Sequence, residues 1–401
     1  MSHVLDGIRV LDFSRVFAAP DSTQVFGDLG ADVIKIETPD RGDSCRYLGV
    51  TREELEAIGP PSPSFRAFNR NKRSIALDLG AEAGRRVARR LVADADILVN
   101  NFRPGTMERW GLGYDELKEA HPRLIYCDFT AYGSEGPLSH IGANDLALQA
   151  HSGLMSITGE EGGGPVRAGA AIIDLHASLA IVSGVLAALY HREKTGRGQR
   201  VETSLLQSSA HFLSYFYQDY WLTGNLHERM GTANHLSVPN QAFPTSDGYV
   251  VIIAPSDEMW KRCAQALDAE KLDVERFSTS SERLRLRKEV IAAMSQVTMR
   301  FTKHELHEKL SAARVNVSIV QDIGEAADHP QLRAIGGVFD FETGGAPHRY
   351  IATPFRLSET PGTMRSPPPG LGEQTDEILR GAGYSAAEID ALRADGAFGE
   401  T

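Results

Sequence analysis

Cysteine is scarce in this chain of 401 residues. The three cysteines lie far apart in the sequence, and none belongs to a CxxC pair: Cys45, Cys127 and Cys263. Zinc sites and disulfide frameworks need several closely spaced cysteines, so the sequence indicates neither, and we expect no metal site. The first residues, 1–6, also lack the basic and then apolar pattern of a secretory signal. We therefore expect a reducing, cytoplasmic compartment.

Acidic residues outnumber basic ones: the chain has 42 Lys and Arg and 53 Asp and Glu, which gives a net charge of −11. Nucleic-acid binding needs a strongly basic face, so this balance argues against a nucleic-acid partner, although one basic pocket for a phosphorylated ligand still fits it. We find no apolar run of about 20 residues and expect no membrane-spanning segment. Hydrophobic residues make up 42% of the chain, as in globular proteins, and its length suits two domains of about 150 residues each.

The first fifty residues lack the glycine fingerprint of a dinucleotide site. A buried strand is predicted over 9–13, a helix over 20–29 and a second strand over 33–37. Strand, helix and strand within about thirty residues form a βαβ unit, which implies a parallel sheet. The turn at 14–20 has the sequence SRVFAAP instead of GxGxxG, and this argues against a nicotinamide-dependent enzyme.

The alternation of strands and helices continues to about residue 130 and predicts a doubly wound α/β domain. Further strands are predicted at 75–79, 97–100 and 124–129, with a helix over 82–92. The basic segment 68–74 before the first of them is typical of a solvated surface turn. Ligands of such a sheet bind at the carboxyl ends of its strands.

A smaller α+β domain is predicted after residue 225. We expect a hairpin over 242–253 with its turn at 246–248, then charged helices and a strand at 315–320. Short alternating segments from 338 to 354 suggest strands that return to the first domain. The predicted domains are a large one, 1–225, a small one, 226–330, and a return segment that completes the large domain, 331–401.

One acidic residue follows a run of small residues, and an apolar segment of helical length follows that acid. Asp174 comes after 165–173, and a basic, glycine-containing stop closes the helix at 194–198. We predict that Asp174 is the N-cap of this helix, near free N–H groups and the positive end of the helix dipole. It is then either a capping residue only or a carboxylate nucleophile that the helix terminus holds ionised.

Seven motifs, in this order, resemble those of one family, the class III CoA-transferases. This group includes formyl-CoA transferase, carnitine CoA-transferase and 2-methylacyl-CoA racemase. Each motif is weak alone, but their ordered combination extends nearly from end to end. The matching segments are 5–12 (LDGIRVLD), 30–37 (GADVIKIE), 71–74 (NKRS), 101–105 (NFRPG), Gly159, 195–199 (TGRGQ) and 371–376 (LGEQTD).

The resemblance implies a fold and an activity. Members of the family are interlocked homodimers with a Rossmann-like large domain, built from both chain ends, and a smaller domain. Their nucleophile is an aspartate at the position of Asp174. The implied activity is CoA transfer from an acyl-CoA to a small carboxylic acid through an aspartyl mixed anhydride and an aspartyl-CoA thioester, without a metal.

The resemblance also implies contacts to the co-substrate coenzyme A. Arg109 is the candidate for phosphate pairing, because a guanidinium group binds phosphate with two hydrogen bonds. The family positions that line the CoA site match Val16, Ala18, Leu77, Leu79, Asn101, Phe102 and Arg109.

Two further residues are catalytic candidates. Asn144 stands where the racemase branch carries a histidine, and an amide cannot act as a general base at neutral pH. A racemase would then need His151 or His176 as its second base. Asp145 is similar to an acidic family position beside the substrate.

Four other positions depart from the common family pattern. Thr38 stands where many members have an arginine that contacts CoA, and Gln374 replaces a usual histidine. Ala19 and Ser178 each replace a glycine.

Three functions remain open from the sequence. Intermolecular CoA transfer leads, an isomerase (intramolecular CoA transfer or 2-methylacyl-CoA epimerisation) is the alternative, and a CoA-binding protein without chemistry is the third. Substrate choice is expected to depend on the 159–164 loop, the region of Asn144 and the small domain. Arg15 and Arg167 are charged groups that could pair with a second carboxylate, which would favour dicarboxylic acids.

Overall fold

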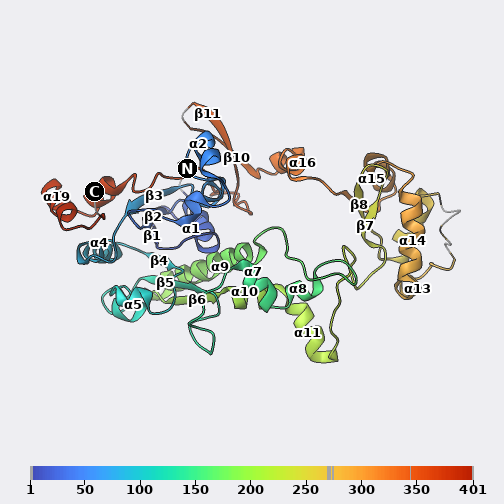
Figure 1. The fold of residues 1–401 in the computed structure, drawn as a ribbon, viewed down its shortest axis with the longest axis horizontal. Helices are drawn as coiled ribbons and strands as arrows, with labels where there is room; N and C mark the ends of the chain where they lie inside the picture. Colours follow the sequence, from blue (N-terminus) through green and yellow to red (C-terminus); the bar gives the residue numbers. More distant parts are fainter. Residues whose placement is uncertain (1–2, 269–271, 273–274, 344, 400–401) are drawn as a thin grey trace. The chain divides into compact units, whose positions relative to one another are not determined.

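The chain forms two compact units. The computed structural model describes residues 3–268, 272, 275–343 and 345–399 (Figure 1). The first unit contains segments from both ends of the chain: Met1–Leu154, Ala168–Asn225 and Arg333–Thr401. The second consists of Met155–Arg167 and Leu226–Leu332.

The segment 155–167 groups with the second unit, whereas we placed it in the large domain. Local contacts within that unit explain the difference. Gly231 donates its backbone N–H to the carbonyl of Gly159 at 2.8 Å, and the Arg229 side chain donates to the carbonyl of Gly163 at 3.0 Å. These bonds join the glycine-rich loop to a stretch of chain some seventy residues later.

A six-stranded parallel sheet is the centre of the first unit. Its strand order is β3-β2-β1-β4-β5-β6, so the order reverses between β1 and β4, as in a doubly wound fold. The strands are β1 (Arg9–Asp12), β2 (Asp32–Glu37), β3 (Lys72–Ala76), β4 (Ile97–Asn100), β5 (Ile125–Thr130) and β6 (Arg200–Ser204).

Strand β3 begins inside the basic segment that we assigned to a solvated turn. Lys72 is buried and pairs with Asp12 at 2.9 Å, and Arg73 pairs with Asp32 at 2.7 Å. Because carboxylates on β1 and β2 neutralise these charges, two basic residues fit within the sheet. The prediction of a strand at 75–79 therefore missed its first three residues.

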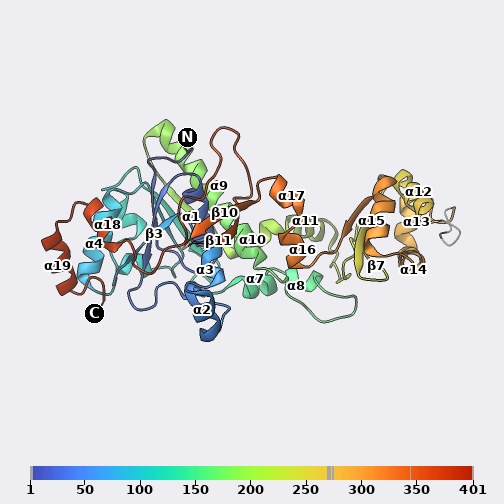
Figure 2. The ribbon, with the colours of Figure 1, turned by 90° about the horizontal axis from the view of Figure 1, so that it is seen from above.

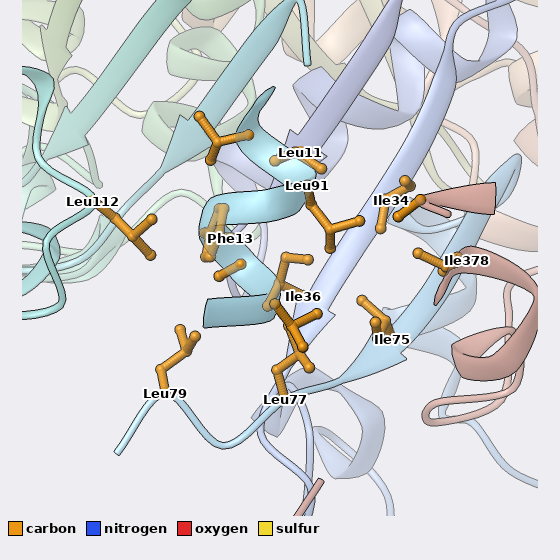
Figure 3. Close-up of a cluster of buried hydrophobic side chains, with 14 of the residues drawn as sticks. Leu11, Phe13, Ile34, Ile36, Ile75, Leu77, Leu79, Leu91, Leu112 and Ile378 are labelled. Carbon is orange, nitrogen blue, oxygen red and sulfur yellow. The ribbon is translucent and has the colours of Figure 1, made fainter. Parts of the chain in front are cut away.

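Helices cover both faces of the sheet. The helices α1 (Ala18–Asp28) and α9 (Ile172–Thr195) pack on each other and on one face, and α4 (Glu82–Ala93), α18 (Thr375–Gly381) and α19 (Ala386–Ala394) cover the other. Figure 3 shows the core on this second face, where Ile378 of α18 lies beside Ile34 and Ile75 of the sheet. The C-terminal helices thus supply core side chains to the N-terminal strands. Figure 2 shows α18 and α19 on the same side of the sheet as α4.

Helix α9 corrects our expectation about apolar runs. It has 24 residues and a mean hydropathy of 2.0 over its best window, which is long and apolar enough to cross a membrane by those measures alone. Several of its apolar side chains, including Ile181 and Val185, are fully buried against the rest of the unit. Packing on α1 and on the strands β5 and β6 accounts for the buried face of this helix, whereas Leu179 and Tyr190 are exposed in this chain.

The segment after residue 337 forms a hairpin, β10 (Val338–Thr343) and β11 (Ala346–Ile351). We predicted strands here, but they form a separate two-stranded sheet and do not join the central sheet. The remaining helices of the first unit are short: η1 (Ser44–Tyr47), α2 (Arg52–Ile58), α3 (Pro63–Phe68), α5 (Thr106–Arg109), α6 (Tyr114–Leu117), α7 (Asp145–His151), α10 (Leu205–Phe212) and α11 (Ser214–Thr223). The chain passes between the units four times, at 154/155 in α8 (Leu154–Ile157), at 167/168, at 225/226 and at 332/333 in α17 (Pro330–Ala334).

The second unit is an α+β structure around a three-stranded antiparallel sheet. The predicted hairpin is confirmed, because Pro244 pairs with Tyr249 across the turn at 245–248. Its buried core contains Trp260, Phe243 and the apolar faces of the helices. The elements are β7 (Asn240–Pro244), β8 (Tyr249–Ile253), β9 (Asn316–Ile319), α12 (Asp257–Ala266), α13 (Ser280–Arg285), α14 (Arg287–Thr298), α15 (Lys303–Ala312) and α16 (Ile323–Ala327).

We predict that Gly198→Ala destabilises the first unit by about 1–3 kcal/mol. A Cβ at this position would lie 2.1 Å from the carbonyl oxygen of Leu124, so the turn before β6 would have to move. Gly381→Ala is the matched control, because nothing lies within 4 Å of its Cβ position. Urea unfolding of the two variants measures the difference, and equal free energies of unfolding would contradict the predicted close approach.

Candidate active site

A cavity of about 290 Å³ lies at the carboxyl edge of the central sheet. Its walls come from the turns after β1 and β4 and from the end of β5, so it lies at the point where the strand order reverses. This is where the sequence predicted a ligand site. The lining residues are Arg15, Val16, Phe17, Ala18, Asn101, Phe102, Arg103, Pro104, Phe129, Thr130, Ala131, Ser139, Ile141, Gly142, Ala143, Asn144, Asp174 and Leu205.

Asp174 lies in the first turn of α9 and lines this cavity. It is the third residue of the helix, and the N-cap is Ala171, so the prediction that Asp174 is the N-cap is wrong. Asp145 takes the capping role from α7, because its Oδ2 accepts the backbone N–H groups of Ile173 at 2.8 Å and Asp174 at 3.3 Å. The Asp174 side chain is therefore not needed to cap α9.

The ionisation of Asp174 also differs from our expectation. Burial, and then the charge of Asp145, raise the pKa of Asp174 from 3.8 to about 7. The helix terminus therefore does not hold this carboxyl ionised well below neutral pH. A carboxyl group with a pKa near 7 is a stronger base than an ordinary aspartate and is still partly ionised at neutral pH.

Gln149 completes the support of the α9 terminus, and the sequence analysis missed it. Gln149 is fully buried one helical turn after Asp145, and its amide nitrogen donates to Asp145 Oδ1. Its oxygen accepts the backbone N–H of Ala168 at 2.9 Å. The signal in the sequence was the i, i+4 spacing of an acid and an amide, which places the two side chains on one face of a helix.

Asn144 lines the cavity as the N-cap of α7. Its side-chain oxygen accepts the backbone N–H of Ala147 at 3.2 Å. Of the three predicted catalytic residues, Asp174 and Asn144 thus face the cavity, whereas Asp145 is buried behind it and acts on the α9 terminus.

Four of the seven predicted CoA contacts line the same cavity as Asp174: Val16, Ala18, Asn101 and Phe102. Asn101 has a further role, because its amide oxygen accepts the N–H of Arg15 at 3.0 Å and its amide nitrogen donates to the Arg15 carbonyl at 2.7 Å. Both ends of this side chain are therefore engaged by the turn after β1.

The other three predicted contacts lie elsewhere in the first unit. Leu77 and Leu79 are buried in the hydrophobic core of Figure 3, so only their backbone is available for the predicted adenine contact. Arg109 is exposed on α5, and its guanidinium group donates to Thr106 at 3.0 Å. These contacts stay predictions.

Two arginines give the cavity its positive charge. Arg15 was a candidate from the sequence, whereas Arg103 was not. The Arg15 guanidinium carbon lies 5.1 Å from the ring centre of Phe102. In the described part of the chain, neither arginine forms an ion pair with a carboxylate. The cavity that Asp174 lines therefore also presents two guanidinium groups without a carboxylate partner among the described residues. Arg167, our other candidate, belongs to the second unit, and its contact stays a prediction.

The histidines considered as second bases do not line the cavity among the described residues. His176 Nδ1 lies 2.6 Å from Ser208 Oγ, and its other nitrogen lies 3.3 Å from His211. Burial and then His211 lower the pKa of His176. His151 is exposed and packs against Tyr132. Both histidines thus have structural contacts within the first unit and do not need a role in catalysis to explain their presence.

Metal ligands are not grouped in the described residues, since no three His, Cys, Asp or Glu side chains lie together there as an ion would need. The cavity instead offers an apolar wall, two guanidinium groups and one partly buried carboxyl. This combination suits an anionic organic ligand whose reacting carbon approaches Asp174.

Comparisons with known proteins agree with the resemblance seen in the sequence. The model of CoA-transferase family III matches residues 5–375. The succinate–glutarate CoA-transferase of Agrobacterium fabrum is 34% identical over 378 residues, which cover 94% of this chain and 94% of that protein. The succinyl-CoA:glutarate CoA-transferase of Homo sapiens is 35% identical over 389 residues, which cover 94% of this chain and 85% of that protein.

A solved structure is similar over nearly the whole chain. It is a CAIB/BAIF family protein of Brucella suis with 32% sequence identity and a TM-score of 0.85, and the match covers 95% of this chain and 100% of that one. The long family match, the curated relatives and this fold lead to one conclusion: the chain is an enzyme of CoA-transferase family III.

Proposed function

We propose that this enzyme transfers CoA from an acyl-CoA to a small carboxylic acid and that Asp174 is its covalent nucleophile. One observation carries the proposal. Of the described residues that line the cavity, Asp174 alone has a side chain that titrates near neutral pH, and it is partly buried in the same cavity that Arg15 and Arg103 line. Asp145 acts as a positioning residue, because it fixes the backbone of the turn that carries Asp174.

The proposed steps need no redox partner. The Asp174 carboxylate attacks the thioester carbonyl and expels CoA thiolate, which leaves an acyl–aspartyl anhydride. The thiolate then attacks the aspartyl carbonyl of the anhydride and releases the donor acid, leaving an aspartyl-CoA thioester. An incoming carboxylate attacks this thioester and forms a second anhydride with release of thiolate. Attack of the thiolate on the new acyl carbonyl gives the product acyl-CoA and frees Asp174.

The environment of Asp174 suits these steps. Partial burial strips water from the carboxyl, and this raises its pKa and its basicity as a nucleophile. A site with little water also protects the anhydride and the aspartyl thioester from hydrolysis. The CoA thiolate remains beside the anhydride that it must attack, which favours the second step by proximity.

We further propose that the acceptor is a dicarboxylic acid. The relatives from Agrobacterium fabrum and Homo sapiens are named for succinate and glutarate, and the cavity holds two guanidinium groups without a carboxylate partner in the described residues. One carboxylate of the acid reacts at the Asp174 thioester, and the other pairs with Arg15. Charge-assisted bonds of this kind select a diacid over a monoacid of similar length.

The alternatives have less support. Epimerisation at the α-carbon needs a second base, and the described cavity residues supply none besides Asp174. Intramolecular transfer would use the same nucleophile but no free acceptor. A binding protein without chemistry would not need a carboxyl with a raised pKa in its cavity. The interlocked homodimer and the cytoplasmic location stay predictions.

We predict that Asp174→Asn lowers CoA transfer about 10³-fold or more, because an amide cannot form the anhydride. The assay follows acyl-CoA formation by chromatography with a panel of acyl-CoA donors and diacids. Hydroxylamine trapping with peptide mass mapping should find a hydroxamate at Asp174 in the wild type. The Asp145→Asn variant is the matched control and should keep this adduct, whereas full turnover by Asp174→Asn would refute the assignment.

The pH profile should report the ionisation of Asp174. Only the carboxylate attacks, so kcat/KM should fall as pH drops below about 7, the pKa to which burial and Asp145 raise it. Asp145→Asn removes the like charge and should move this limb to lower pH, but not to the ordinary value of 3.8, because burial remains. Asp115→Asn, an exposed site paired with Lys118, is the control and should leave the limb in place. An unmoved limb in Asp145→Asn would contradict the electrostatic coupling.

Arg15→Met should lower the preference for diacids. We expect the ratio of kcat/KM for succinate to that for butyrate to fall about tenfold or more, the loss of one charge-assisted pairing. Arg86→Met, at an exposed position of α4, is the control and should keep the ratio. An equal loss for both acids would mean that Arg15 serves CoA or the fold instead of the second carboxylate.

A further inference from the structure

The turn after β1 contains a strained residue at the cavity. Val16 has a φ of +73°, and it is the sole β-branched residue with a positive φ in the part of the chain that the structure describes. A β-branched residue in this region is a true outlier that persists only when its surroundings hold it there. Val16 is also 38% exposed and lines the cavity, so this strained residue faces the ligand.

The buried ion pair of Lys35 and Asp43 forms hydrogen bonds to the backbone of the turn on both sides of Arg15. Lys35 Nζ donates to the carbonyl of Ser14 at 2.8 Å, and both carboxylate oxygens of Asp43 lie 3.2 Å from the backbone nitrogen of Val16. Lys35 and Asp43 pair with each other at 3.0 Å, and both side chains are fully buried. Together with Asn101, which binds the N–H and carbonyl of Arg15, this pair fixes three consecutive residues.

The ion pair is itself held in place. The backbone N–H of Asp43 donates to Glu37 at 3.0 Å, and Asp43 accepts the N–H of Cys45 at 2.9 Å as the N-cap of η1. Glu37 in turn forms a buried pair with Arg46 at 2.7 Å. Although burial alone would lower the pKa of Lys35, the neighbouring carboxylates Asp43, Asp12 and Glu37 raise it, so Lys35 stays charged.

We propose that Lys35 and Asp43 are positioning residues that hold Val16 in its strained conformation and so keep the turn at 14–16 preformed for the acyl-CoA. This inference rests on the proposed function, which places CoA in the cavity that Val16 lines. A buried ion pair is weak evidence for a role in stability, because apolar replacements of similar size often stabilise a protein equally well. Its contacts to the turn account for its presence, since a preformed turn lowers the ordering cost of binding.

The test replaces both Lys35 and Asp43, so that neither is left as an unpaired buried charge. In Lys35→Met/Asp43→Asn, the asparagine oxygen at the Oδ1 position still accepts from Cys45 and Val16, but Ser14 loses its donor and the Val16 N–H faces an amide NH₂ group in place of the second carboxylate oxygen. We expect the Kd for CoA, measured by titration calorimetry, to rise about tenfold with unchanged stoichiometry. A merely structural role would instead lower the fraction of sites that bind and leave the Kd of the remaining sites unchanged.

A second pair of variants isolates the strain. Val16→Gly and Val16→Ala both remove the isopropyl group, but only glycine adopts a positive φ without cost. In the Lys35→Met/Asp43→Asn background, glycine should bind CoA several-fold more tightly than alanine, whereas the two should differ little when the ion pair is intact. Equal affinities in the neutralised background would overturn the inference.

Controls separate the remaining outcomes. Asp28→Asn/Arg70→Met neutralises another buried pair of the first unit that does not line the cavity, and it should lower the Tm but not the affinity for CoA. An equal loss of affinity in this control would overturn the inference.

A second measurement applies if the Lys35→Met/Asp43→Asn variant does not fold. The Tm of Val16→Gly should then still exceed that of Val16→Ala, and the reverse order would overturn the inference. A wild type that does not bind CoA would refute the proposed function itself.

Discussion

Buried charge at the carboxyl edge of the sheet is the constraint on which the first unit depends. Three ion pairs join the end of β1, the strand β2, the first residue of β3 and the loop after β2: Lys72 with Asp12, Lys35 with Asp43, and Arg46 with Glu37. Each charge is desolvated, so each needs its partner and its hydrogen bonds. The pairs therefore fix β1, β2 and β3 relative to one another, and Lys35 and Asp43 also hold the turn after β1 that forms part of the cavity wall.

Much of the fold could be predicted because it follows from local patterns. The strands β1, β2, β4 and β5 and the hairpin of the second unit show the expected apolar periodicity, and their predicted ranges overlap the observed ones. The start of β3 could not be predicted in this way. Lys72 and Arg73 look like surface residues until Asp12 and Asp32 are placed beside them, and that placement comes from the pairing of strands distant in sequence.

In the candidate site, too, local patterns predicted some features, whereas others depend on residues distant in sequence. The sequence identified Asp174 and several cavity residues by their motifs, but it placed Asp174 at the N-cap and expected a low pKa. The cap comes from Asp145, twenty-nine residues earlier, and the pKa follows from burial, which no local pattern encodes. Arg103 and Gln149 were missed because their roles arise only where separate segments meet.

The C-terminal helices have a consequence for how the protein is made. Ile378, Leu379 and Leu392 complete the core that packs on β1 to β3, so the part of this face that α4 does not cover stays open until residues 375–394 have left the ribosome. Most of the second unit, 226–332, emerges earlier and has its own core. During synthesis the inserted unit is therefore able to fold first, before the helices that complete the N-terminal sheet, some three hundred residues after β3, have been made.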